Sequence, residues 1–217
     1  MPGTDRRVFV FDLDGVVRNF DSLEIDAQIE QELGLPSGTL WHLTMESAEL
    51  KQAVTGGLTR LEWEDLIEAE LCVRTRTGAD VARSFQRWRD NVGKLDSATV
   101  DIIESLRAKG LPVFLFTNGT DRVPAELAAL GVAELFHGVL NSFNYGVRKP
   151  QAGAYQCAHR EIEATLDRRV APGSVFFTDD KEANVLAARD FGWQAEVFSG
   201  FGVVGGSCQG DKNHQQQ

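Results

Sequence analysis

Two aspartates separated by a single residue, Asp12 and Asp14, are the first feature of the sequence that could do chemistry. In an extended segment alternate side chains point to the same side, so the two carboxylates can share a cation. Carboxylates that close repel one another unless a positive charge neutralises them. A second acidic pair, Asp179 and Asp180, could complete the site around a hard, oxygen-preferring ion such as Mg²⁺. The sequence therefore predicts a divalent metal site formed by these four aspartates.

Hydrogen-bond donors gather in the middle of the chain, at Thr117 and Asn118. They are followed by Gly119 and a helical stretch, so hydroxyl, amide and main-chain donors meet at one turn, an arrangement that binds phosphate oxygens. Lys149 adds a fixed positive charge just before Pro150. We expect Thr117 and Asn118 to bind phosphate and Lys149 to stabilise negative charge.

A carboxylate nucleophile, a neighbouring carboxyl, a divalent ion and donors for a tetrahedral anion together describe phosphoryl transfer. In this interpretation Asp12 attacks phosphorus in line and forms an aspartyl-phosphate. Asp14 protonates the leaving oxygen and then, as a carboxylate, deprotonates the water that cleaves the intermediate. The metal and Lys149 offset the negative charge of phosphate beside acidic groups.

Three short apolar runs must position these groups, at residues 8–11, 113–116 and 175–177. Continuous β-branched and aromatic runs of this length are typical of strands buried on both faces of a parallel sheet. Each run ends at one of the polar groups named above, and helical stretches with glycine stops lie between the runs. Alternating strands and helices predict an α/β fold with a parallel sheet, in which ligands bind beyond the carboxyl ends of the strands.

The stretch from residue 18 to residue 95 has helical periodicity and no comparable apolar strand. Ile25, Ile29 and Leu33 share one helix face, and two further faces follow at residues 61–71 and 81–92. This pattern predicts a helical module inserted over the strand ends, although a helical part of a single domain would give the same pattern. We therefore expect a core of residues 1–17 and 96–204, a helical insertion of residues 18–95, and a disordered tail at 205–217.

Four segments resemble, in order and spacing, the signature motifs of the haloacid dehalogenase-like hydrolase superfamily. They are residues 12–17 (DLDGVV), 116–119 (FTNG), 148–150 (RKP) and 177–180 (FTDD) with Asn184. The resemblance spans residues 8–198, and four motifs in order at predicted strand ends or loops are far more specific than any one alone. It implies a Rossmann-like three-layer parallel sheet core with an inserted α-helical cap, Mg²⁺ dependence and an aspartyl-phosphate route.

The resemblance also implies a role for each matching residue. Asp12 corresponds to the nucleophile, Asp14 to the acid/base that also offers its backbone carbonyl to Mg²⁺, and Lys149 to the charge stabiliser. Thr117 and Asn118 correspond to the phosphate binders. By its spacing from Asn184, Asp180 rather than Asp179 matches the direct metal ligand.

Within the superfamily, true dehalogenases generally lack the second aspartate of the first motif, so Asp14 favours a phosphatase. Residues 144–150 and 177–180 look most like the branch that contains bacterial sugar-phosphate phosphatases and the phosphatase domain of soluble epoxide hydrolase. A sugar phosphate is the first expected substrate and a nucleoside monophosphate the second. A phosphomutase, a 2-haloacid dehalogenase and a catalytically silent binding module are the alternatives.

Composition limits the partners and the compartment. The 217 residues carry a net charge of −10 without a basic run, which argues against nucleic acid or an anionic membrane surface as partner. Three widely spaced cysteines indicate a reducing compartment, and the first residues lack the apolar segment of a signal peptide, so we expect a cytosolic protein. The sequence leaves open whether it is a monomer or a homodimer. It also assigns no role to His42, Arg60, Arg148 or the three tryptophans of the helical region.

Overall fold

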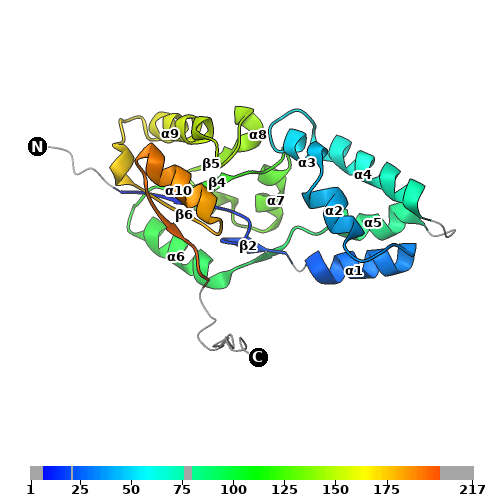
Figure 1. The fold of residues 1–217 in the computed structure, drawn as a ribbon. Coiled ribbons are helices and arrows are strands. Elements are labelled where there is room, and N and C mark those ends of the chain that lie inside the picture. The colour runs from blue at the N-terminus through cyan, green and yellow to red at the C-terminus, as the bar shows by residue number, and fades with distance from the viewer. Residues whose placement is uncertain (1–6, 21, 76–79, 201–217) are drawn as a thin grey trace, which may run out of the picture.

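The computed structural model describes residues 7–20, 22–75 and 80–200 (Figure 1). A five-stranded sheet lies at the centre of its core, with the strand order β5-β4-β1-β6-β7 and every neighbouring pair parallel. The strands are β1 Val8–Phe11, β4 Val113–Thr117, β5 Gly138–Asn141, β6 Val175–Asp179 and β7 Gln194–Val197. The predicted parallel α/β fold is thereby confirmed. The tail predicted at 205–217 lies outside the described residues.

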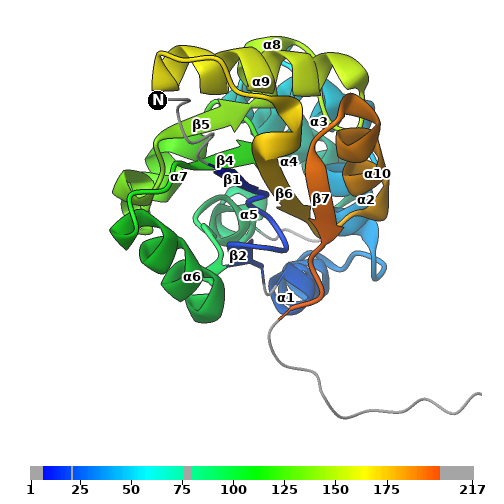
Figure 2. The same ribbon diagram turned by 90° about the vertical axis from the view of Figure 1, so that its left-hand side faces the viewer.

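Alternation along the strands divides the core into two apolar layers. Val8 and Val10 of β1 pack into one layer, whereas Phe9 and Phe11 face the other. Helices α9 (Ala152–Leu166) and α10 (Glu182–Phe191) cover the first face, and α6 (Ser97–Ala108) and α7 (Val123–Ala129) cover the second (Figure 2). The sheet is therefore buried on both sides, which explains why its central strands are apolar throughout.

Local signals set the ends of the core helices. Asp96 caps α6 by accepting a hydrogen bond from the backbone N–H of Thr99, and Gly110 and Gly192 follow α6 and α10 with positive φ angles of 68° and 103°. The core is completed by α8 (Ser142–Tyr145) and by 3₁₀ turns at Ala133–Leu135 and Pro172–Ser174. None of the helices within the described ranges has the length and apolar character needed to cross a bilayer.

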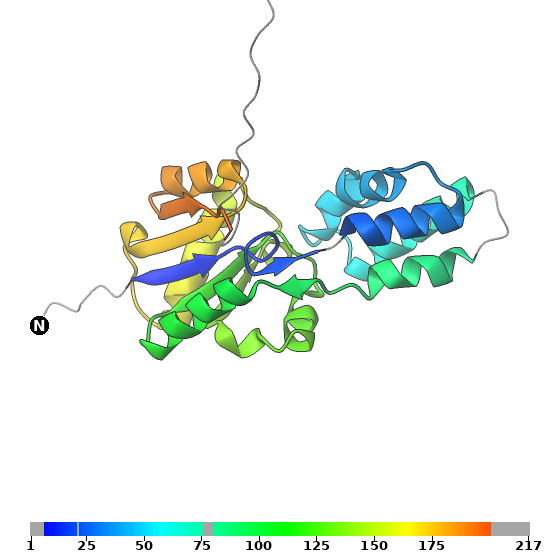
Figure 3. The same cartoon turned by 90° about the horizontal axis from the view of Figure 1, so that it is seen from below.

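Five further helices, here called the helical insertion, form a second cluster beside the core (Figure 3). They are α1 Ser22–Leu33, α2 Thr39–Met45, α3 Ala48–Ala53, α4 Arg60–Arg74 and α5 Val81–Arg89. They enclose an apolar centre of their own, in which Trp63 packs edge-on against Trp88 with ring centroids 5.6 Å apart, and Phe85 stacks on Trp88 at 5.2 Å.

A two-stranded antiparallel ribbon joins the helical insertion to the core. In it β2 (Arg18–Asn19) pairs with β3 (Lys94–Leu95). The sequence does not predict this ribbon, because two-residue strands are too short to show alternation. The ribbon brings the entry and exit of the insertion together, as Figure 3 shows between the two lobes.

The helical insertion contacts the core at the carboxyl ends of the strands. The Ser142 hydroxyl donates to the carbonyl of Val54 at 2.6 Å, and the backbone N–H of Arg60 donates to Asp121 Oδ1 at 2.7 Å. A Cβ on Gly56 would lie 2.7 Å from the carbonyl oxygen of Phe143, so glycine permits this close approach. These contacts place the insertion over the edge of the sheet that carries the polar residues.

Candidate active site

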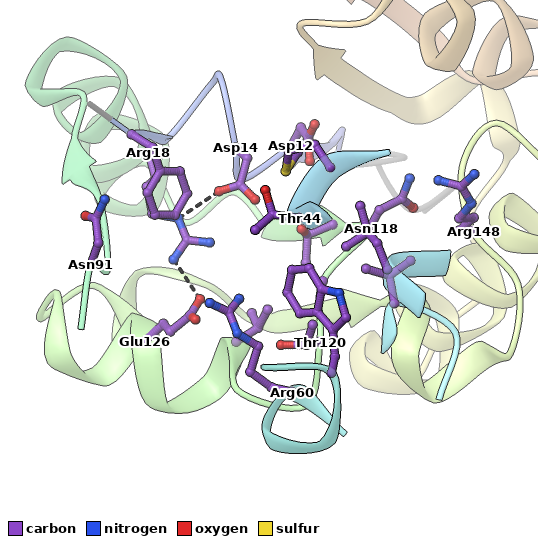
Figure 4. A pocket seen from close by; sticks show the side chains of 18 of the residues that line it. Asp12, Asp14, Arg18, Thr44, Arg60, Asn91, Asn118, Thr120, Glu126 and Arg148 are labelled. Carbon is purple, nitrogen blue, oxygen red and sulfur yellow. Dashed lines mark hydrogen bonds and ion pairs between the residues drawn. The ribbon is translucent and has the colours of Figure 1, made fainter. Parts of the chain in front are cut away.

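A cavity of about 330 Å³ lies between this edge of the sheet and the helical insertion (Figure 4). Asp12 follows β1, and its backbone N–H donates to the carbonyl of Thr178 in β6 at 2.9 Å. Thr117 is the last residue of β4, and Lys149 comes from the loop before α9. The parallel sheet thus brings together residues that are more than a hundred positions apart.

Lys149 is the centre of the buried part of the site. Its Nζ lies 2.8 Å from Asp12 Oδ1 and 2.6 Å from Asp179 Oδ2, and it donates to the carbonyl of Phe116 at 2.8 Å. Only 2% of Lys149 is exposed. A buried ammonium needs such partners, because an unpaired charge away from water is very costly.

Burial and neighbouring charge shift the pKa values of this group in different directions. Burial raises the pKa of Asp12 to about 7, reinforced by the charge of Asp179, although Lys149 acts in the opposite sense. Burial alone would lower the pKa of Lys149, but its two carboxylates raise it, so the amine is charged. Burial likewise opposes ionisation of Asp179, but Lys149 and donors from Lys181 and Asn184 lower its pKa overall. Ionised Asp12 would therefore be stabilised by one more positive charge.

Three carboxylates lie close enough together to hold a metal ion, which could provide that charge. Oxygens of Asp12, Asp179 and Asp180 lie within 4.8 Å of one another, and hard oxygen donors of this kind suit Mg²⁺. Gly15, with a φ of 89°, makes the approach possible, because a Cβ there would lie 2.7 Å from Asp180 Oδ2. The residues present thus fit a divalent ion.

The two adjacent acids of the cluster differ in their contacts. Asp179 is fully buried, and its oxygens accept hydrogen bonds from Lys149, the Lys181 backbone and the Asn184 amide. Asp180 is exposed, and its carboxyl group lies beside Gly15. Asp179 therefore positions Lys149, whereas Asp180, which contacts Asp179, is the more accessible ligand for an ion.

Thr117 and Asn118 lie at the end of β4 and both line the cavity. The Asn118 side chain, however, exchanges two hydrogen bonds with the backbone of Lys149: its amide donates to the carbonyl at 3.0 Å, and its Oδ1 accepts from the N–H at 2.9 Å. Asn118 thus fixes the loop that presents Lys149, a contact that the sequence does not predict.

Asp14 lies at the rim of the same cavity with 48% of its side chain exposed. Arg18 donates from Nε to Asp14 Oδ1 and from a terminal nitrogen to Glu126 Oε2, both at 2.7 Å (Figure 4). Sequence reasoning missed Arg18 and Glu126, because their pairing joins residues 108 positions apart. The only local signal was a cation four residues after Asp14.

The helical insertion provides the remaining wall of the cavity. Most of the side chains that it contributes are apolar or aromatic, namely Trp41, Met45, Leu50, Val54, Trp63 and Trp88, with Phe20 from the connecting segment. Arg60 and Arg148 also line the cavity, and the Arg60 guanidinium lies over the Trp88 ring at 4.6 Å. His42, in contrast, pairs with Glu46 on the surface and is not among the lining residues.

Curated relatives include two enzymes. The sesquiterpene phosphatase astK of Aspergillus oryzae is 28% identical over 122 residues, covering 53% of this chain and 56% of the relative. The bifunctional epoxide hydrolase 2 of Rattus norvegicus is 24% identical over 201 residues, covering 86% of this chain and 35% of the relative. The chain therefore spans about half and about a third of the lengths of these relatives.

Solved structures share the fold at low identity. A HAD family enzyme, bt-2542 from Bacteroides thetaiotaomicron, in complex with magnesium and inorganic phosphate, is 18% identical with a TM-score of 0.66, covering 92% of this chain and 98% of that one. The L-2-haloacid dehalogenase RSc1362 is 21% identical with a TM-score of 0.61, covering 88% and 86%.

The sequence model of one family extends across both the core and the helical insertion. It describes haloacid dehalogenase-like hydrolases and matches residues 6–192, which include Asp12, Asp14, Lys149 and the acidic pair after β6. The chain therefore belongs to the haloacid dehalogenase-like hydrolase family.

Proposed function

We propose that this hydrolase is a Mg²⁺-dependent phosphatase that cleaves a small phosphate monoester through an aspartyl-phosphate intermediate. The observation that carries the proposal is a pair of aspartates with unlike surroundings at one cavity. Asp12 is buried against Lys149, whereas Asp14 is half exposed and held by Arg18. Carboxyl groups in such different environments can act as nucleophile and as proton donor.

Asp12 is oriented for attack by its own contacts. Within the described part of the chain, its side chain accepts from the Leu13 backbone at 2.7 Å and from Lys149, both at Oδ1. Oδ2 is left to attack phosphorus, so that a bond from Oδ2 to phosphorus forms while the ester P–O bond breaks. Lys149 holds the carboxylate in place and offsets negative charge as phosphate approaches.

Asp14 handles the protons of both steps. Its carboxyl gives a proton to the alcohol oxygen as the ester bond breaks. The resulting carboxylate accepts a proton from the water that attacks phosphorus, which releases inorganic phosphate and restores Asp12. Mg²⁺ held by Asp12, Asp180 and the backbone carbonyl of Asp14 would supply positive charge at the phosphate oxygens.

Two other activities of the same fold make different demands on the site. A 2-haloacid dehalogenase displaces a halide ion, which leaves without a proton, so neither Asp14 nor a metal is needed. The three-carboxylate cluster and the placement of Asp14 at the cavity favour the phosphatase. A phosphomutase would share the first step but return the phosphoryl group to the same intermediate, so it would not release phosphate over many turnovers.

The helical insertion, with residues 18–95, is proposed to act as a cap on a core of residues 1–17 and 96–204. Its contacts over the strand ends support this role, since a cap excludes bulk water and contacts the leaving group. A small phosphorylated metabolite is the proposed substrate. A sugar phosphate stays a prediction of the sequence, and the similarity to a sesquiterpene phosphatase favours an ester of a more apolar alcohol.

Replacing the nucleophile tests the proposal. Asp12→Asn should lower phosphate release from an aryl phosphate by at least about a thousandfold, because an amide cannot attack phosphorus. The control is Asp101→Asn, which neutralises an exposed acid on α6 and should keep wild-type rates. Thermal melting checks that both variants fold. Wild-type turnover by Asp12→Asn would refute the role, and a wild-type protein inactive with Mg²⁺ on every monoester would favour the binding module.

A further inference from the structure

The helical insertion forms one wall of the cavity, and large apolar side chains are exposed on this wall. Trp41 and Met45 are 44% and 47% exposed, and Phe20, which also lines the cavity, is 38% exposed. Large apolar groups that stay in water mark a binding surface when they gather at one cavity. Since the phosphate is proposed to bind at Asp12 and Lys149 of the core, these side chains of the insertion would contact the leaving group.

One carboxyl group interrupts this apolar wall. Asp26 of α1 lines the cavity, is only 6% exposed, and its Oδ1 has no hydrogen-bond partner among the described residues. Glu30, one turn further along α1, is different: its two oxygens accept from the backbone N–H groups of Gly38 and Leu40. Glu30 therefore has a structural role that Asp26 lacks. A buried acceptor without a donor costs stability and needs an explanation.

A second residue that lines the cavity also has an unpartnered polar atom. The indole N–H of Trp63, which is 2% exposed, has no acceptor within the described ranges. An indole N–H can only donate, whereas an ionised carboxylate can only accept. A hydroxyl group both donates and accepts, so it is the simplest neutral group that suits either atom.

The neighbouring charge argues against a cationic ligand. Arg60 points into the cavity in Figure 4, and its guanidinium lies over the rings of Trp63 and Trp88 at 5.0 and 4.6 Å. The faces of Trp63 and Trp88 that could attract an ammonium group are thus already covered by a cation. A neutral donor meets no such repulsion.

We propose that Asp26 determines specificity by accepting a hydrogen bond from a hydroxyl group on an otherwise apolar leaving group. This inference rests on the proposed phosphatase function, since it names the alcohol part of the ester. The substrate class is a phosphate monoester of a hydroxylated, hydrocarbon-rich alcohol, with the phosphate at Lys149 and the hydroxyl at the insertion end of the cavity.

A set of six-carbon phosphates tests the proposal. Phosphate release is measured for hexyl phosphate, for the five isomers of hydroxyhexyl phosphate with the hydroxyl on carbon 2, 3, 4, 5 or 6, and for 6-aminohexyl phosphate. At least one hydroxylated isomer should exceed hexyl phosphate in kcat/KM by about tenfold, the scale of one hydrogen bond to a charged group. The amino compound should gain nothing. If no hydroxylated isomer is preferred, or the amino compound is preferred over all of them, the proposal is wrong.

Asp26→Leu removes the acceptor at similar size, and Glu24→Leu on the same helix is the control, because Glu24 is exposed. The preference for the hydroxylated isomer should disappear in the first variant and persist in the second. Asp26→Leu should also raise the unfolding midpoint, whereas loss of a structural contact would lower it. A retained preference in Asp26→Leu would overturn the assignment. If that variant does not fold, Asp26→Asn should weaken the preference by removing the charge, and an unchanged preference there would overturn it equally.

Binding separates this inference from the proposed reaction. Hexylphosphonate and the hydroxylated phosphonate of the best isomer cannot be hydrolysed, so their dissociation constants are measured by calorimetry on the wild-type protein with Mg²⁺. Tighter binding of the hydroxylated compound, lost in Asp26→Leu, would support the role of Asp26 even if no ester is turned over. Equal binding of both compounds would contradict it even if turnover is fast.

Discussion

The contacts of Lys149 explain how one cation can serve two acids. Its ammonium reaches Asp12 and Asp179, and the Asn118 side chain fixes its backbone. Asp179 is fixed in turn by Asn184. Each side chain at the bottom of the cavity is therefore positioned by at least one other, which would keep Asp12, the proposed nucleophile, in one orientation before a phosphate ester binds.

The close approach of Gly15 to Asp180 can be tested by a single substitution. Gly15→Ala should destabilise the fold by about 1–2 kcal/mol through its positive φ, and should in addition weaken Mg²⁺ binding, because the new Cβ meets Asp180 at 2.7 Å. Gly110→Ala is the matched control, since Gly110 also has a positive φ but nothing within 4 Å of the added Cβ. Both variants should melt earlier, and only Gly15→Ala should need more Mg²⁺ for half-maximal activity. Equal Mg²⁺ requirements would contradict the close approach.

The raised pKa of Asp26 predicts that the stability of the fold depends on pH. Burial, reinforced by Glu30, raises its pKa from 3.8 to about 6, so the folded chain disfavours the ionised carboxyl. Below about pH 4 the group is protonated in both states and costs nothing; as pH rises toward 6 the unfolded chain gives up its proton more readily, and stability falls. Asp26→Asn should therefore melt higher than wild type at pH 7.5, and this advantage should shrink at pH 4.5. A constant difference between the two pH values would contradict this origin.

Among the strands and helices, the central strands and the residues that follow them were the features most readily predicted from the sequence. The runs that became β1, β4 and β6 are apolar on both faces, so their ends and the polar groups after them are visible without a structure. Edge strand β5 (Gly138–Asn141) was not predicted, because it is short, begins with glycine and is only half buried.

Long-range pairs account for what the sequence analysis missed in the site. Arg18 of β2 meets Glu126 of α7, and Asp26 lines a cavity formed by several elements. None of these three residues belongs to a periodic pattern or to a motif. The residues of the four motifs were visible because their spacing follows from strand ends, whereas the pairing of single polar side chains depends on how the elements pack.

The contact between α4 and the loop after β4 offers a test of docking. Asp121 accepts from the backbone N–H of Arg60, so Asp121→Ala should loosen the helical insertion and raise KM about two- to fivefold with little change in kcat. Thr59→Ala is the control: it removes the capping box of α4, costs about 1 kcal/mol of stability, and leaves the contact with the core in place. An unchanged KM in Asp121→Ala, or an equal rise in Thr59→Ala, would argue against docking at this point.

The whole chain carries a net charge of −10, which would repel a phosphate ester, the proposed substrate. The cations Arg18, Arg60, Arg148, Lys149 and Lys181 all line the one cavity where phosphate is expected, against the acids Asp12, Asp14, Asp26 and Glu126. Several of these cations are paired with acids, so the cavity carries little excess positive charge. A bound divalent ion would tip the balance toward an anion.

Metal binding therefore predicts a stability change that does not depend on turnover. Mg²⁺ at about a hundred times its dissociation constant should raise the unfolding midpoint by about 5–10 °C, because an ion that binds only the folded chain stabilises it. Asp180→Asn removes an exposed ligand but leaves both ion pairs of Lys149 in place, so it should lose more than half of this shift. Asp101→Asn, an equally exposed change on α6, should keep the full shift, and NaCl at matched ionic strength should produce none. A full shift in Asp180→Asn would show that the ion binds elsewhere, and the carboxylates after β1 and β6 would then need another reason to lie so close together.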